Sequence, residues 1–261
     1  MLNIFKIGTS AAGARLKIWI AESKLDGSMV PGDIHFSDDH EHYLVKLNLD
    51  DEGPYNSEMM EYAYYLTARH CGISMMDSKL IDHRHFATKR FDRMAGEKIH
   101  VLTASGITGW DFKDPSNASY ENLFELALFL KLPHAQIEEL FRRMVFNLVF
   151  ANNDDHLKNH SFLYDRHNDR WQLSPAYDLT YSLNPLVNFK KTSRALAINH
   201  KRIDIGLADV KLIAQKYTVR NYLGIMEEVQ SGMAFWQHCT KDLGVPLKIR
   251  ERIARVFVVL K

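Results

Sequence analysis

Apolar and polar positions alternate along the first third of the chain in a way that is typical of strands. Residues 16–21 are rich in β-forming residues, and Leu25-Asp26-Gly27 supplies a turn signal after them. Residues 79–82 and 85–91 favour a hairpin across Asp82-His83-Arg84. In residues 42–49 every second position is apolar, which predicts a strand with one buried face. That face would carry Tyr43, Val45, Leu47 and Leu49, with Leu44, Lys46 and Asn48 on the other.

Helical spacing dominates most of the remaining sequence. A helix is predicted over 57–70, because Asn56 or Ser57 can cap its start and Gly72 can end it. Helices are also predicted over 120–131, over the strongly apolar stretch 137–149, and through most of the chain after about residue 209. Residues 104–119 are expected to form a loop, and 161–164 with 171–173 a hairpin. The pattern predicts an α+β protein with a small β-rich N-terminal lobe, 1–95, and a larger, mainly helical C-terminal lobe, 96–261.

The composition indicates where the protein is located and which partners it lacks, but it does not indicate an activity. The formal net charge is +1, so the total charge points to neither a nucleic-acid partner nor a membrane surface. The N-terminus lacks the apolar run and cleavage site of a signal peptide, and no apolar run could span a bilayer. Cys71 and Cys239 lie far apart and do not suggest a disulfide framework. We therefore expect a cytoplasmic protein that binds neither nucleic acid directly nor a membrane.

The polar cluster at 152–160 carries the clearest chemical signal, because it directly follows the apolar helix at 137–149. It contains the pattern Asp-x-His-x-x-Asn and is followed by the hairpin and then by Asp178. Kinases build their phosphoryl-transfer site in this way, with an aspartate that accepts the substrate proton and two later residues that hold Mg²⁺. The spacing predicts Asp154 as the catalytic base and Asn159 and Asp178 as the metal ligands.

A kinase also needs a lysine for the nucleotide phosphates, and Lys46 interrupts a strand in the first lobe. Glu61, in the second turn of the helix at 57–70, is the predicted ion-pair partner, and Glu58 is the competing choice. The loop 8–17 is rich in small residues, so its backbone around Gly13 could approach phosphate oxygens.

Together these segments resemble the HipA-like toxin kinases in sequence and in order. The resemblance covers residues 8 to about 180 and is carried by 8–15, Val45-Lys46, 88–93, 153–159 and 173–178. It implies a two-lobed, protein-kinase-like fold, ATP with Mg²⁺, and phosphorylation of serine in a protein such as an aminoacyl-tRNA synthetase. It also implies that Lys89 and Phe91 meet the adenine, that Asp92 lies near the ribose, and that Ser10 is an autophosphorylation site.

The resemblance also implies partners. A toxin of this family is expected to have an antitoxin. The sequence begins close to the small-residue loop, whereas longer members carry an additional N-terminal subdomain. We therefore expect that this subdomain is either a separately encoded protein or dispensed with. Ala12 stands where many members have a second glycine.

Two other functions fit parts of the same sequence. A metal-dependent phosphohydrolase could use a dinuclear site made of Asp154, Asp155, His156 and Asp178. Such an enzyme would leave Lys46, Glu61 and the small-residue loop without a role. A non-catalytic, kinase-like co-repressor of a DNA-binding antitoxin is the second alternative, although every catalytic position is filled.

Overall fold

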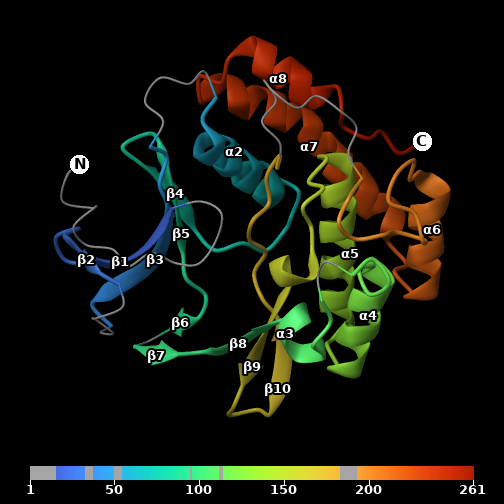
Figure 1. Ribbon diagram of the computed structural model, residues 1–261, viewed down its shortest axis with the longest axis horizontal. Coiled ribbons are helices and arrows are strands. Elements are labelled where there is room, and N and C mark those ends of the chain that lie inside the picture. The colour runs from blue at the N-terminus through green and yellow to red at the C-terminus, as the bar shows by residue number, and fades with distance from the viewer. Residues whose placement is uncertain (1–15, 33–37, 50–54, 95, 112–113, 183–192) are drawn as a thin grey trace. The chain divides into compact units, whose positions relative to one another are not determined.

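The computed structural model describes residues 16–32, 38–49, 55–94, 96–111, 114–182 and 193–261, and the predicted site residues Ser10 and Gly13 lie outside them. The described chain divides into two compact units (Figure 1). The first contains the described residues up to Tyr62 together with Met76–Ile99, and the second contains Ala63–Met75 and His100–Lys261.

The first unit is built on a five-stranded antiparallel sheet in the order β2-β1-β3-β5-β4. Its strands are β1 (Lys17–Ser23), β2 (Met29–Pro31), β3 (His40–Lys46), β4 (Ser78–Ile81) and β5 (His85–Lys89). The predicted turn after β1 is present, with Gly27 at a φ of 71°. The predicted hairpin is also present, and Asp82 and His83 both adopt positive φ in its turn.

One face of this sheet forms a hydrophobic core whose buried members include Ile18, Ile20, Tyr43, Val45, Leu47, Ile81 and Ala87. The prediction that Leu49 belongs to the same face is wrong, because its side chain is 55% exposed. Strand β3 ends at Lys46, and the backbone N–H of Asn48 then donates to Nδ1 of His85. The period of two is therefore lost before Leu49 is reached.

Helix α2 (Ser57–His70) has the predicted bounds. Asn56 caps its start, since its Oδ1 accepts from the backbone N–H of Met59 at 2.8 Å. Gly72 follows its end with a φ of 76°, a conformation that glycine adopts without the cost that a Cβ imposes.

The segment after β5 contains more regular structure than the sequence predicts. Strands β6 (Arg93–Met94) and β7 (Glu97–Lys98) pair with each other. Strand β8 (His100–Thr103) joins the predicted hairpin of β9 (Ser161–Asp165) and β10 (Arg170–Leu173) in a sheet of order β10-β9-β8. The predicted loop at 104–119 begins instead with the short helix α3 (Ala104–Thr108), which the side chain of Thr103 caps.

The second unit is mainly helical. In the described ranges its helices after α3 are α4 (Tyr120–Phe129), α5 (His134–Val149), the short 3₁₀ turn η1 (Leu157–Asn159), α6 (Leu207–Lys216), α7 (Tyr222–Asp242) and α8 (Leu247–Ala254). Every apolar position that predicted the α5 helix is buried. Helix α7 packs against the same core, where Trp236 meets the ring of Tyr64 edge-on at 6.3 Å.

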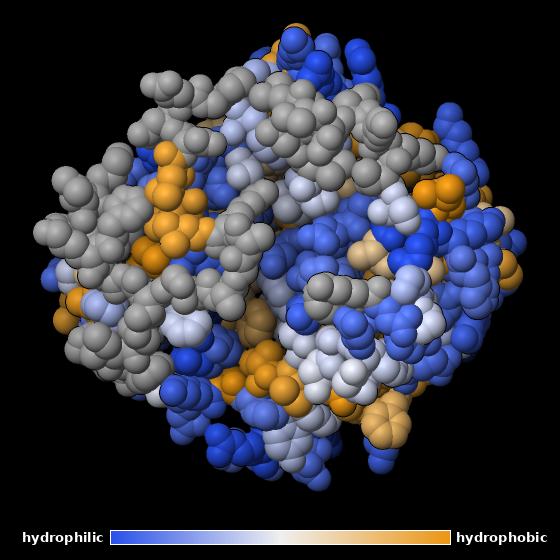
Figure 2. All heavy atoms as spheres, viewed as in Figure 1, coloured by the Kyte–Doolittle hydropathy of each residue, from blue (hydrophilic) through white to orange (hydrophobic). Residues whose placement is uncertain are grey.

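Figure 2 shows a described surface that is largely hydrophilic on this face, with hydrophobic side chains in separate patches. Within the described ranges, no helix combines the length and the hydropathy that a transmembrane span requires.

Candidate active site

The polar cluster at 152–160 begins where α5 ends. Phe150 closes the helix, and Ala151 turns the chain away with a φ of 52°. The side chain of Asn152 then donates to Oδ1 of Asn147 on the last turns of the helix at 2.9 Å. A buried helix thus fixes one end of the loop, as a catalytic loop requires.

Asp154 is the exposed carboxylate of this loop, with 62% of its side chain accessible. The surrounding protein nevertheless partly desolvates the carboxyl group and raises its pKa, and the negative charges of Asp178 and Asp155 raise it further. His156, whose Nε2 lies 3.8 Å from the carboxylate, acts in the opposite direction. Asp154 and Asp178 are distant in sequence but near enough in space to interact through their charges.

Asn159 is attached to the same loop by its amide group. Its Nδ2 donates to the backbone carbonyl of Asp154 at 2.8 Å. Because a carbonyl can only accept, this bond assigns the amide nitrogen and leaves Oδ1 as the acceptor available for a cation.

Asp178 has an unusual backbone conformation, with a φ of 55°. A left-handed conformation in a residue other than glycine costs about 1 kcal/mol or more, and such residues cluster at functional sites. Its neighbour Tyr177 holds the segment to the loop at 152–160, since the phenol donates to the carbonyl of Lys158 at 2.8 Å and also contacts Oγ of Ser161. Ala176 is fixed by a backbone bond to Ser74.

These residues fit Mg²⁺ rather than a metal with nitrogen or sulfur ligands. Mg²⁺ takes hard oxygen donors and keeps several waters, so the Asp178 carboxylate and the Asn159 amide oxygen are a suitable protein contribution. Among the described residues, no group of three or more His, Cys, Asp and Glu side chains is arranged to hold a metal.

Asp155 does not belong to the exposed site. Its carboxylate is fully buried, lies 2.5 Å from Nη2 of Arg194, and accepts from the Tyr120 hydroxyl at 2.8 Å and the Leu196 N–H at 3.2 Å. A carboxylate with these three donors is committed to the protein interior. The dinuclear hydrolase site that would include Asp155 is therefore contradicted by its surroundings.

Arg194 and Tyr120 are the structurally important residues that the sequence analysis missed. Ala195 donates its N–H to the carbonyl of Asn153 at 2.8 Å, so this segment lies directly beside the loop at 152–160. A signal was present, because Arg194 is followed by the apolar run Ala195 to Ile198, where an arginine needs a buried partner.

Lys46 and Glu61, both in the first unit, form the predicted ion pair at 2.5 Å. Only 7% of the lysine side chain and 3% of the glutamate side chain are exposed. Glu58, the competing choice, accepts from the hydroxyl of Ser57 at 2.8 Å. A buried pair of this kind fixes the lysine nitrogen in one position.

In the segment that was predicted to meet adenine and ribose, Lys89 and Asp92 form ion pairs with other residues of the first unit. Lys89 pairs with Glu41, and Asp92 accepts from Arg90 at 2.7 and 2.8 Å and from Arg93 at 2.6 Å. Burial acts to raise the pKa of Asp92, but these two arginines lower it overall. The nucleotide contacts of Lys89, Phe91 and Asp92 stay predictions.

Comparison with known proteins gives the family. The model of the HipA-like C-terminal domain matches residues 9–236, and this chain belongs to that family. A chain of the solved complex of the Shewanella oneidensis MR-1 toxin–antitoxin system HipA, HipB and its operator DNA has a similar fold, with a TM-score of 0.62 and 17% identity. The match covers 96% of this chain and 65% of that one. The likeness confirms the predicted α+β, kinase-like fold.

Two curated proteins are also similar, and both are named as candidate kinases. Y4dM of Sinorhizobium fredii is 25% identical over 216 residues, which are 74% of this chain and 51% of that protein. A Haemophilus influenzae protein is 29% identical over 176 residues, which are 60% of this chain and 50% of that protein. The chain thus spans about half the length of the curated relatives that it matches.

Proposed function

We propose that this chain is an ATP- and Mg²⁺-dependent serine/threonine protein kinase. The observation that carries the proposal is the hydrogen bond that joins Asn159 to Asp154, together with the charge effect of Asp178 on the Asp154 carboxyl and the Tyr177 contact that holds the Asp178 segment to the loop. Phosphoryl transfer needs a proton acceptor beside oxygen atoms that bind the metal. The protein otherwise contributes mainly by positioning the reactants and stabilising their charge.

In this proposal each residue has one role. Asp154 accepts the proton of the substrate hydroxyl, while Asn159 and Asp178 hold Mg²⁺. Bound Mg²⁺ would neutralise phosphate charge and hold the nucleotide in place. The amine of Lys46, which Glu61 holds, contacts the phosphates. Lys89, Phe91 and Asp92 meet the base and ribose, and the backbone around Gly13 meets the phosphates.

The biological setting is proposed from the family. We propose a toxin that phosphorylates a translation protein, such as an aminoacyl-tRNA synthetase, and that is opposed by an antitoxin. Ser10 is the proposed autophosphorylation site, where a phosphoryl group would add about −1.5 to −2 charges and compete with the nucleotide for the same cations. The alternative of a non-catalytic co-repressor would leave the buried Lys46–Glu61 pair without a function.

Calorimetric titration with a non-hydrolysable ATP analogue tests the nucleotide site. We expect saturable binding that requires Mg²⁺ in the wild-type chain and that is much weaker in Asp178→Ala at the same Mg²⁺ concentration. A chain that binds no nucleotide with or without Mg²⁺ would exclude the kinase. The target is then sought by phosphoproteomics of cells that express the wild type or Asp154→Ala. A serine phosphosite on a translation protein in the wild type alone is the expected result, and identical phosphoproteomes would refute the toxin role.

A further inference from the structure

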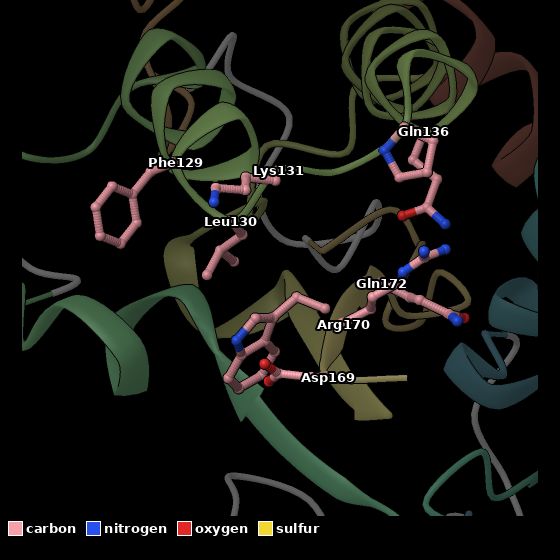
Figure 3. Close-up of a pocket in the computed structure, with 9 residues that line it drawn as sticks. Phe129, Leu130, Lys131, Gln136, Asp169, Arg170 and Gln172 are labelled. Carbon is pink, nitrogen blue, oxygen red and sulfur yellow. The ribbon is translucent and has the colours of Figure 1, made fainter. Parts of the chain in front are cut away.

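A groove separate from the catalytic loop lies between the α4–α5 connection and strand β10 of the second unit. It encloses about 660 Å³. Its walls are the end of α4 with the following turn, the first turn of α5, and the β9–β10 hairpin. Figure 3 shows Leu130 and Lys131 on one side of this space and Asp169 and Arg170 on the other.

The floor of the groove is the open edge of a sheet. β10 is the terminal strand of the order β10-β9-β8 among the described strands. Ser174 donates its N–H to Ser161, towards β9, at 2.9 Å, whereas Leu173 donates to Oε1 of Gln136, away from β9, at 2.8 Å. Antiparallel ladders alternate, so the N–H and C=O of Trp171 also point away from β9. In the described part of the chain, neither group of Trp171 has a hydrogen-bond partner.

Gln136 shows that this strand edge can form a hydrogen bond with a group outside the sheet. Its amide oxygen takes the place that the carbonyl of a neighbouring strand would occupy opposite Leu173. The next donor and acceptor along the edge belong to Trp171, a residue that lines the cavity. An extended peptide could pair with them, since exposed strand edges are templates for strand addition.

The side chains around the edge specify the chemistry of such a peptide. Lys131 and Arg170 are cations without an ion-pair partner in the described ranges, and Phe129 is a large apolar side chain that is 80% exposed. The carboxylate of Asp169, which also lines the groove, accepts from the Tyr164 hydroxyl at 2.6 Å, so the two cations outnumber it. Arg170 and Trp171 are neighbours on a strand, so their side chains point to opposite faces of the sheet. A strand paired with them meets a cation on one face and an aromatic ring on the other.

We propose that this groove binds an extended peptide segment of a partner protein in which acidic and apolar residues alternate. The backbone of that segment pairs with Trp171, its acidic residues face Arg170 and Lys131, and its apolar residues pack on Trp171 and Phe129. The inference concerns protein recognition, and it does not depend on the kinase proposal.

The test uses a fluorescein-labelled heptapeptide of alternating valine and glutamate, and measures fluorescence anisotropy with the full chain in the absence of nucleotide. We expect saturable binding that weakens about fivefold in Arg170→Glu, which corresponds to the upper range for one exposed ion pair. The matched control is Arg166→Glu, which makes the same charge change at an exposed position of the same hairpin outside the groove. It should bind like the wild type.

Two altered peptides separate backbone pairing from charge. Methylation of the central backbone nitrogen removes a donor and should also weaken binding, and a valine–lysine peptide should not bind. The proposal is overturned if the glutamate peptide does not bind, if the lysine peptide binds equally well, or if Arg166→Glu weakens binding as much as Arg170→Glu. It is also overturned if sedimentation shows a dimer that Arg170→Glu dissociates, because a second copy would then occupy the edge.

Discussion

Arg194 and Asp155 form a buried ion pair, in which Nη2 lies 2.5 Å from Oδ2 and the two side chains are 2% and 0% exposed. The pair joins the residue that follows Asp154 to the segment 194–196. Ala195 and Leu196 add hydrogen bonds to the same stretch of loop. The backbone position of the proposed catalytic base therefore depends on a contact between distant parts of the chain.

Arg194→Met should lower the free energy of unfolding by about 3–5 kcal/mol, because it leaves the Asp155 carboxylate buried without its cation. Adding Asp155→Asn should recover part of this loss, since the uncompensated charge is removed while an acceptor for Tyr120 is kept. Urea denaturation measures both. Arg166→Met, at an exposed position, is the control and should change little. A double variant no more stable than Arg194→Met would contradict the role of the pair.

Lys46→Met should both destabilise the chain and weaken nucleotide binding, because it leaves Glu61 buried alone. The double variant Lys46→Met/Glu61→Gln should regain stability and still bind nucleotide poorly. The comparison of denaturation with calorimetry separates the two roles of Lys46. Lys79→Met breaks the more exposed Lys79–Glu22 pair of the same sheet and should cost about 1 kcal/mol or less. Restored nucleotide binding in the double variant would remove Lys46 from the site.

Tyr177→Phe should reduce phosphotransfer by about 10- to 100-fold, since small misplacements of reacting groups have effects of this size. The lost hydroxyl joins Lys158 and Ser161, on either side of Asn159, to the segment that carries Asp178. Stability should fall by only about 1 kcal/mol. Initial rates and urea denaturation are compared with those of Tyr181→Phe, which alters a buried tyrosine nearby. Equal rates in the two variants would show that the Tyr177 hydroxyl does not position the site.

The sequence predicts elements whose signals are local. Asn56 and Gly72 bracket α2, and the positive φ of Asp82 and His83 fits the turn predicted there. It does not predict helix α3, because residues 104–108 span little more than one turn and the Thr103 side chain caps their start. A helix of about one turn is too short to show a hydrophobic period, so the sequence pattern cannot predict it.

The candidate site likewise has features that the sequence predicts and features that depend on tertiary structure. The sequence indicates Asp154, Asn159 and Asp178 by their spacing, but it cannot distinguish the exposed Asp154 from the buried Asp155 beside it. That difference is set by Arg194, which is 39 positions away. Likewise, the choice of Glu61 over Glu58 depends on how α2 faces β3, a tertiary feature.

Stability should fall as the pH drops below 6.5, with His42 as one cause. Burial lowers the pKa of His42 from its ordinary value of 6.5, and the charges of Arg90 and Arg93 lower it further. The unfolded chain then binds a proton that the native state does not, so acid favours unfolding. His42→Gln should reduce the slope of stability against pH in this range, while His83→Gln, at an exposed turn, should not. An unchanged slope in His42→Gln would contradict this assignment.

Transfer of the γ-phosphate of labelled ATP, in the presence of Mg²⁺, tests the central claim most directly. Dephosphorylated casein and the chain itself are the acceptors, and the wild type is compared with Asp154→Asn. We predict label on serine in the wild type, no label with EDTA, and a rate about 10²- to 10⁴-fold lower in the variant. Equal labelling by a folded Asp154→Asn chain would contradict the account.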